Sequence, residues 1–328
     1  MMKLTLERLK TVTHGAVSVT EDNGVFTFHR FTQSGETYYQ ETSPRDFYPK
    51  TFATSGVKLD FYTDSSMFAL DYTVSAASSR RFYYLDVYLD GALKYHRGER
   101  NMWQNGGHLQ FGLKEGEHRV TVWFPCLCAC RVSNITLDDG ASIRPVTHAH
   151  RMLCFGDSIT QGYDAEYNAL AYTNQLASRF DCEMINQAIG GEKFVPGILD
   201  RDFAKAYVPD IITVAYGTND WAGFEAELFH TRCEAFLSGL AELYPEADIF
   251  VITPLWRADH HRITKAGSFE SAIEFITRTA EKYNLHVING YRLTPHFPAF
   301  YSDERLHPND LGFEEYAKNL IVKMQEVL

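Results

Sequence analysis

The chain has 328 residues, and its composition and charge exclude several classes of protein. Apolar residues make up 45% and charged residues 22%, as in globular proteins, and no apolar stretch is long enough to span a membrane. The formal net charge of −11 opposes binding to a phosphate backbone, and no run of Lys and Arg offsets it. We therefore expect neither a membrane nor a nucleic acid as partner.

The first residues and the cysteines indicate a compartment. Charges within Met1–Arg8 stand where a secretory signal would need a continuous apolar segment, so we expect a cytoplasmic protein. Six cysteines in a chain of this length are too few for a disulfide scaffold. Cys126, Cys128 and Cys130 alternate at strand period, which favours small buried side chains over a metal site.

The length favours two domains, and the first half of the chain has the pattern of an all-β domain. Residues 57–61 and 68–74 alternate between apolar and polar side chains, which is typical of antiparallel strands. Asp90-Gly91 lies between two further runs, where a tight hairpin turn needs positive φ. We find no amphipathic helical stretch of useful length here. Residues 1–145 are therefore predicted to form a β-sandwich or jelly-roll domain.

The second half, residues 146–328, alternates short apolar runs with helical patterns. The runs suit parallel strands that are covered on both faces, and they occupy residues 151–155, 184–189, 211–216, 249–253 and 287–288. Segments with the wider apolar spacing of helices lie between and after them, at residues 168–180, 224–243, 269–284 and 310–327. This order predicts a doubly wound α/β domain.

Residues capable of catalysis follow the predicted strands. Ligands of open α/β sheets bind beyond the carboxyl ends of the strands. Ser158 comes just after the first strand, Gly191 after the second and Asn219 after the third, while His307 precedes the last helix. We therefore expect these four residues to meet at one edge of the sheet.

These residue types suit acyl transfer. A serine hydroxyl needs a neighbouring base in order to attack a carbonyl, and His307 can supply it. The tetrahedral intermediate carries negative charge, which preorganised donors must receive. We assign three donors: the backbone N–H groups of Ser158 and Gly191 and the side-chain amide of Asn219. Asn309 or Asp310 would cap the final helix.

Four ordered blocks in this half resemble those of the SGNH hydrolases, also called the GDSL esterase/lipase family. They are Gly-Asp-Ser-Ile-Thr at 156–160, Asn-Gln-Ala-Ile-Gly-Gly at 186–191, Gly-Thr-Asn-Asp at 217–220 and Leu-His-Pro-Asn at 306–309. Residue 160 is threonine, so the Gly-x-Ser-x-Gly elbow of ordinary α/β-hydrolases is incomplete. The resemblance covers residues 150–328.

The resemblance implies a fold and a set of roles. It implies a three-layer αβα, flavodoxin-like domain with a five-stranded parallel sheet and with no metal or organic cofactor. Ser158 would be the nucleophile, His307 the base, and Gly191 and Asn219 contributors to the oxyanion hole. The preceding β-rich half is similar to the N-terminal sandwich of carbohydrate esterase family two, on domain order and strand pattern alone.

The acid that would orient His307 is left open by the sequence. The family usually has Asp-x-x-His, but here Glu304 stands three residues before the histidine and Asp303 stands four before it. Residue type favours Asp303, and spacing favours Glu304. Some carbohydrate esterases of this kind use a Ser-His dyad with a backbone carbonyl, in which case neither carboxylate is needed.

Two tryptophans are candidates for substrate contacts. Trp221 follows the Asn219 block and Trp256 follows the fourth strand, so both rings could stack on a sugar or an acyl chain, with core packing or a domain interface as the alternative. His260-His261 is assigned to the surface rather than to a metal. We expect a serine esterase acting on small acyl esters, acetyl above all, of carbohydrate-type alcohols. Alternatives are a lysophospholipase or thioesterase, and a non-catalytic carbohydrate-binding protein.

Overall fold

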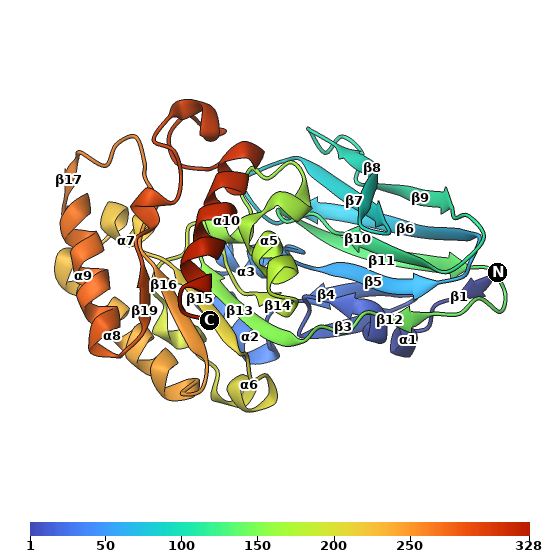
Figure 1. The fold of residues 1–328 in the computed structure, drawn as a ribbon, viewed down its shortest axis with the longest axis horizontal. Coiled ribbons are helices and arrows are strands. Elements are labelled where there is room, and N and C mark those ends of the chain that lie inside the picture. The colour runs from blue at the N-terminus through green and yellow to red at the C-terminus, as the bar shows by residue number, and fades with distance from the viewer. The chain divides into compact units, whose positions relative to one another are not determined.

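The computed structural model describes residues 1–328, which form two compact units (Figure 1). One unit comprises Met1–His148 and Glu166–Ala169, and the other comprises Ala149–Ala165 and Leu170–Leu328. The chain therefore returns to the first unit for four residues shortly after the segment that contains Ser158. Each unit is described by itself below.

The N-terminal unit is a sandwich of two antiparallel sheets. One sheet has the order β3-β4-β11-β6-β9, with β1 also paired to β11, and the other has the order β12-β5-β10-β7-β8, with β2 also paired to β5. The strands of the first sheet are β1 (Met2–Lys3), β3 (Ser18–Asp22), β4 (Val25–His29), β6 (Met67–Ala76), β9 (Gly106–Gly112) and β11 (Cys128–Leu137). Those of the second are β2 (Thr13–His14), β5 (Lys58–Thr63), β7 (Tyr83–Leu89), β8 (Ala92–Glu99), β10 (His118–Trp123) and β12 (Arg144–Pro145).

Alternating apolar side chains build the core of this sandwich, as the period-two pattern predicts. Leu59 and Phe61 of β5 stand opposite Val122 and Val120 of β10, and all four are fully buried. The turn between β7 and β8 places Asp90 and Gly91 at φ of 51° and 81°, which confirms the predicted hairpin. The prediction of an antiparallel sandwich is therefore confirmed.

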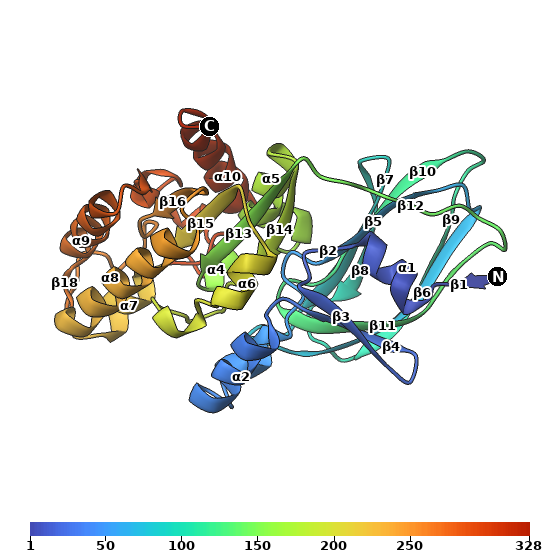
Figure 2. The same ribbon diagram turned by 90° about the horizontal axis from the view of Figure 1, so that it is seen from below.

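The sandwich also carries three short helices that the sequence pattern did not predict. They are α1 (Leu6–Val12), α2 (Gln33–Thr42) and α3 (Phe47–Thr51), and Figure 2 shows α2 projecting from the sheets. Helix α2 begins where the Thr32 hydroxyl accepts a hydrogen bond from the Gly35 N–H. Its buried residues are few, with Tyr39 the only large one. End-capping rather than a broad apolar face therefore marks this helix.

The C-terminal unit is built on a five-stranded parallel sheet, in agreement with the predicted fold class. Its order is β14-β13-β15-β16-β19. The strands are β13 (His150–Gly156), β14 (Cys182–Asn186), β15 (Ile211–Ala215), β16 (Asp248–Ile252) and β19 (His286–Ile288). The direction of winding reverses between β13 and β15, so a crevice opens beyond the carboxyl ends of these two strands.

Helices cover both faces of this sheet, which makes a three-layer domain. Figure 2 shows α5 and α10 on one side of the sheet and α6 and α8 on the other, and α9 packs against α8. The helices are α4 (Ser158–Gln161), α5 (Tyr172–Arg179), α6 (Arg201–Ala206), α7 (Thr218–Gly223), α8 (Ala226–Leu243), α9 (Phe269–Lys282) and α10 (Asp310–Gln325). A two-stranded hairpin, β17 (Ile263–Thr264) and β18 (Gly267–Ser268), precedes α9.

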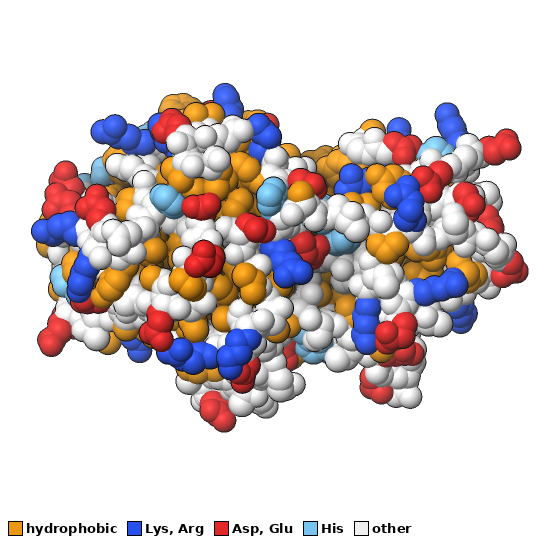
Figure 3. All heavy atoms as spheres, turned by 60° about the horizontal axis from the view of Figure 1, so that its bottom comes forward, with side chains coloured by type: hydrophobic (Ala, Val, Ile, Leu, Met, Phe, Trp, Pro, Cys, Tyr) orange, Lys and Arg blue, Asp and Glu red, His pale blue; other side chains and the backbone are white.

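Two global properties agree with the composition. No helix combines the length and the apolar character needed to cross a membrane. On the face drawn in Figure 3, acidic and basic side chains are interspersed.

Candidate active site

Backbone sterics at the end of β13 position the serine. Gly156 must lack a side chain, because a Cβ atom there would lie 2.1 Å from the Thr160 Oγ1. The Asp157 carboxylate then caps α4, with Oδ1 accepting the Ile159 N–H at 3.0 Å. Ser158 is the first residue of that helix and is 6% exposed. The hydroxyl is thus fixed on a short helix at the crevice beside β15.

The structure brings the serine and the distant histidine together. The Ser158 Oγ lies 3.0 Å from the His307 Nε2. On the other side of the imidazole, Nδ1 lies 2.7 Å from the Asp303 Oδ2. These two contacts have the geometry of a nucleophile, a base and an orienting acid.

Asp303, and not Glu304, makes the contact to His307. Its second oxygen, Oδ1, accepts the backbone N–H groups of Arg305, Leu306 and His307 at 3.0, 2.7 and 3.1 Å. The carboxylate therefore lies across the turn, and a residue four positions before the histidine can reach Nδ1. Glu304 adopts a left-handed φ of 56° in this turn and forms no hydrogen bond with His307.

Hydrogen bonds hold the Asp303 carboxyl in its charged form. Partial burial by itself would raise the pKa of Asp303, but the hydrogen bond with His307 and the backbone N–H donors outweigh it. The pKa of Asp303 therefore lies well below its usual range. An ionised carboxylate at this place can stabilise an imidazolium on His307.

The three groups predicted as oxyanion donors differ in their hydrogen bonds within the protein. The backbone N–H groups of Ser158 and Gly191 have no acceptor within the protein. Gly191 has a φ of 89°, a conformation that favours glycine and that turns its N–H out of the local chain. The Asn219 amide donates to the Glu192 carbonyl at 3.0 Å and, at 3.3 Å, to the Asp157 Oδ2. The longer of these two bonds is the weaker, so that hydrogen is the one available to an oxyanion.

Two buried aspartates brace this oxyanion region. Burial raises the pKa of Asp157 to about 6, against the lowering effect of the Ile159 N–H. Burial likewise raises the pKa of Asp220 to about 7. Asp220 accepts the backbone N–H of Phe194 at 3.1 Å and thereby ties α7 to the chain that follows Gly191. Both carboxylates serve as local hydrogen-bond acceptors rather than as partners of His307.

An aromatic contact to His307 was not predicted from the sequence. The Tyr163 ring stacks on the His307 imidazole, with centroids 5.5 Å apart and planes inclined by 27°. Gly190 makes room for this ring, because a Cβ atom there would lie 2.5 Å from the Tyr163 hydroxyl oxygen. Glycine is thus favoured at the two positions for different reasons: residue 191 has a left-handed backbone, and residue 190 leaves space for an aromatic ring. No sequence signal distinguishes Tyr163 from other tyrosines.

A second unpredicted group is a buried arginine that links two blocks of the site. The Arg257 guanidinium donates to the Thr218 carbonyl at 3.2 Å and to its hydroxyl at 3.0 Å. It also pairs with Asp259 at 2.7 Å. Asp259 in turn lies 3.4 Å from the Arg305 guanidinium, and the Ala258 N–H donates to the Arg305 carbonyl at 2.9 Å. This network joins the helix of Asn219 to the loop of His307.

The two tryptophans predicted as substrate contacts are packed against protein. Trp221 is fully buried, donates to the Gly267 carbonyl at 3.1 Å and has the Arg257 guanidinium 4.8 Å above its ring. It is therefore a core residue rather than a rim residue. Trp256 is 8% exposed and packs on His296 and Tyr301 at centroid distances of 5.7 and 4.9 Å. Little of its ring is left for a substrate.

The cysteines are structural. Cys126, Cys128 and Cys130 are all buried, as predicted, and all six cysteines of the chain are free. Burial raises the pKa of the Cys126 and Cys128 thiols to about 12, so neither is a thiolate at neutral pH.

Comparison with known proteins agrees with this geometry. Residues 154–314 match the model of the GDSL-like Lipase/Acylhydrolase family, and this segment includes Ser158 and His307. This match supports a carboxylic ester hydrolase. Among curated proteins, none matches the chain by sequence.

Solved structures share the fold over nearly the whole chain. The salicylyl-acyltransferase SsfX3 from a tetracycline biosynthetic pathway has a TM-score of 0.81 at 21% identity, covering 96% of this chain and 94% of that one. A family two carbohydrate esterase from Clostridium thermocellum, solved with cellohexaose, has a TM-score of 0.66 at 16% identity, covering 92% and 98%. The acetyl xylan esterase Est2A from Butyrivibrio proteoclasticus has a TM-score of 0.62 at 13% identity, covering 94% and 96%.

Proposed function

We propose that the chain is a serine esterase that hydrolyses small acyl esters, acetyl esters above all, of carbohydrate-type alcohols through an acyl-enzyme. The observation that carries the proposal is the approach of the Ser158 Oγ to the His307 Nε2 at 3.0 Å, with Asp303 on the far side of the imidazole. Donors without an acceptor at Ser158 and Gly191 support it further.

The reaction follows from these contacts. The Ser158 Oγ attacks the ester carbonyl carbon while its proton passes to the His307 Nε2. The carbonyl oxygen becomes an oxyanion beside the N–H groups of Ser158 and Gly191 and the amide of Asn219. His307 then protonates the leaving alcohol, and an acyl-Ser158 ester remains. Water then attacks this ester while its proton passes to His307, and His307 gives that proton to the Ser158 Oγ as the carboxylic acid leaves.

The substrate class and the compartment are finer parts of the proposal. Two of the similar structures are a carbohydrate esterase solved with cellohexaose and an acetyl xylan esterase, and each covers more than nine tenths of this chain. Because their sequence identity to this chain is low, they show a shared fold alone. The acetyl group and the sugar are therefore proposed for this chain. Six buried cysteines without a disulfide fit the reducing conditions of the cytoplasm.

Acyl transfer is a second candidate function, because the acyltransferase SsfX3 covers 96% of this chain with a TM-score of 0.81. Both activities use the same acyl-enzyme. They differ only in whether water or a second hydroxyl compound attacks it, which depends on what binds beside Ser158.

The test is hydrolysis of p-nitrophenyl acetate and of acetylated xylo-oligosaccharides by the wild type, Ser158→Ala and His307→Ala. Turnover should disappear in both variants while their thermal unfolding curves remain cooperative. Retained turnover in Ser158→Ala would eliminate the proposed mechanism. Faster turnover of octanoate than of acetate esters would favour the lysophospholipase or thioesterase alternative. An acetylated product that replaces free acetate when a monosaccharide is added would favour the transferase.

A further inference from the structure

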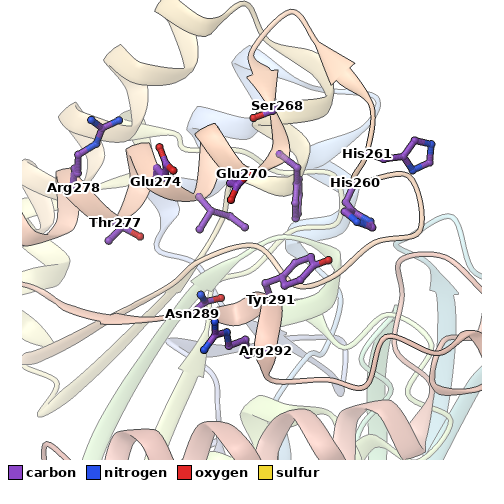
Figure 4. A pocket seen from close by; sticks show the side chains of 12 residues that line it. His260, His261, Ser268, Glu270, Glu274, Thr277, Arg278, Asn289, Tyr291 and Arg292 are labelled. Carbon is purple, nitrogen blue, oxygen red and sulfur yellow. The ribbon is translucent and has the colours of Figure 1, made fainter.

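A large hollow lies in the C-terminal unit apart from the serine site (Figure 4). Its volume is about 850 Å³, within the range of roughly 300–1,000 Å³ that small-molecule sites occupy. Helix α9 forms one wall, and the chain after β19 together with the loop after β16 forms the others. None of Ser158, Asn219 and His307 lines it, so it is not part of the site already described.

Four polar side chains of the hollow form no hydrogen bond or ion pair within the protein. Glu270 and Glu274 lie on α9, and Asn289 and Arg292 lie on the facing chain (Figure 4). All four are exposed, and no ion pair or side-chain hydrogen bond within the protein engages them, although two carboxylates and the guanidinium groups of Arg278 and Arg292 line one hollow. Elsewhere on α9 such groups do pair, as Lys282 does with Glu234 of α8. The lining therefore offers both acceptors and donors, with Glu270, Glu274 and Arg278 on α9 and Asn289 and Arg292 on the facing chain.

This distribution selects the chemistry of a ligand. A ligand with a single charge would pair with the groups of opposite sign and lie beside groups of its own sign. A hydroxyl group both donates and accepts, so a compound with many hydroxyls can bond Glu270 and Glu274 on one side and Asn289 and Arg292 on the other. Hydrogen bonds to charged groups are the stronger ones, which suits a neutral ligand of this kind.

An aromatic side chain completes the wall opposite α9. Tyr291 is partly exposed, and its hydroxyl forms no hydrogen bond within the protein. Figure 4 shows its ring at the end of the hollow near His260. An aromatic ring with a free hydroxyl can contact the apolar C–H face of a sugar and bond its edge. Polar walls around an aromatic end are thus what a sugar ring requires.

The hollow is connected by packing to the loop of the proposed base. His260 lies 6.4 Å from Trp256 between ring centroids, and Trp256 lies 4.9 Å from Tyr301. Tyr301 begins the turn that carries Asp303 and His307, and it pairs as an isolated bridge with Pro308. A ligand in the hollow would therefore contact the same packed unit that holds the base.

We propose that this hollow is a second carbohydrate site, which binds a neutral oligosaccharide through Glu270, Glu274, Asn289, Tyr291 and Arg292. A carbohydrate ligand agrees with the proposed esterase function, and the role of this site in holding a substrate rests on that function. Binding here would hold a glycan on the enzyme while its ester groups react elsewhere.

Calorimetric titration with three unacetylated probes, cellohexaose, xylohexaose and maltohexaose, tests the site without any ester reaction. At least one probe should bind the wild type, and Glu274→Gln and Tyr291→Ala should each weaken that binding about tenfold or more. Glu281→Gln is the matched control, because this exposed glutamate lies on the same helix outside the hollow. The affinity should persist at high salt, whereas binding of a charged ligand would weaken.

The outcomes separate this proposal from the esterase function. Absence of binding for all three probes at about 10 mM would overturn the site. At that concentration even a complex with a millimolar Kd would be detected. Equal affinities in the wild type, Glu274→Gln and Tyr291→Ala would overturn it as well, since the probe would then bind elsewhere. In a further outcome, the wild type binds a probe and yet hydrolyses no ester. If both variants then lose the binding, the site is upheld and the esterase function is refuted.

Discussion

The assignment of Asp303 as the acid gives the sharpest prediction, because its neighbour Glu304 is a built-in control. In Asp303→Asn the side chain keeps its size but has only one oxygen. If that oxygen stays on the backbone N–H groups of the turn, the new NH₂ faces the His307 Nδ1. The imidazole proton must then move to Nε2, which can no longer accept the proton of Ser158.

The size of the effect follows from the bond that is lost. A hydrogen bond to a charged group contributes about 1.5–3 kcal/mol, which corresponds to about a ten- to 150-fold loss in rate. Because the 2.7 Å contact also fixes the tautomer, the full loss should approach about 10⁴-fold. We expect kcat to fall by about 10²–10⁴ in Asp303→Asn and by less than about twofold in Glu304→Gln.

The assay is kcat and KM for p-nitrophenyl acetate at pH 7, with unfolding curves for both variants as a check on folding. The pKa of Asp303 lies below its usual range, so its ionised form stabilises the fold above about pH 4 and this stabilisation is lost as the pH falls further. The stability deficit of Asp303→Asn should therefore be largest at neutral pH and shrink in acid. A kcat within tenfold of the wild type in Asp303→Asn, or an equal loss in Glu304→Gln, would refute the assignment.

Three further predictions concern the surroundings of the serine. Asn219→Ala should lower kcat by about 10²–10³ with little change in KM, and a KM effect without a kcat effect would contradict its oxyanion role. Arg257→Met removes the ties to Thr218 and Asp259, so both Tm and kcat should fall while KM holds; a kcat equal to that of the wild type would show that the network does not position the site. Burial raises the pKa of Asp157 to about 6, so the folded state binds the extra proton and the unfolding free energy should decrease from pH 4 to pH 6, by up to about 1.4 kcal/mol per pH unit. Asp157→Asn should show a smaller decrease in a pH series of denaturant titrations, with the part due to Asp220 remaining, and an unchanged slope would contradict it.

Much of the fold could be predicted because each element is marked by its own local pattern. The strand predicted at residues 211–216 is apolar except at Thr213 and proves to be β15, whose first four residues are buried. The helix predicted at 269–284 agrees with α9 to within two residues. Helix α2 was missed because its sequence has few apolar residues, and its start depends on the single hydroxyl of Thr32.

The site could be predicted only in part, for a related reason. Ser158, Gly191, Asn219 and His307 lie in short blocks whose residue types already limit their chemistry. The tryptophans could not be assigned in this way, since the sequence places Trp221 beside Asn219 and says nothing of the side on which its ring lies. Its position under Arg257, fully buried, follows from how α7 packs.

The sequence by itself determined the alternation of strands and helices, the antiparallel character of the first half and the pairing of Ser158 with His307 beyond the sheet. These depend on side-chain periodicity and on residue chemistry within a few positions. Only the tertiary structure decided that Asp303 rather than Glu304 reaches His307, and that Tyr163 and Arg257 support the site. The reason is physical: the turn at Glu304 has a left-handed backbone, and the contacts of Tyr163 and Arg257 join segments far apart in the chain, so neither is encoded by local spacing.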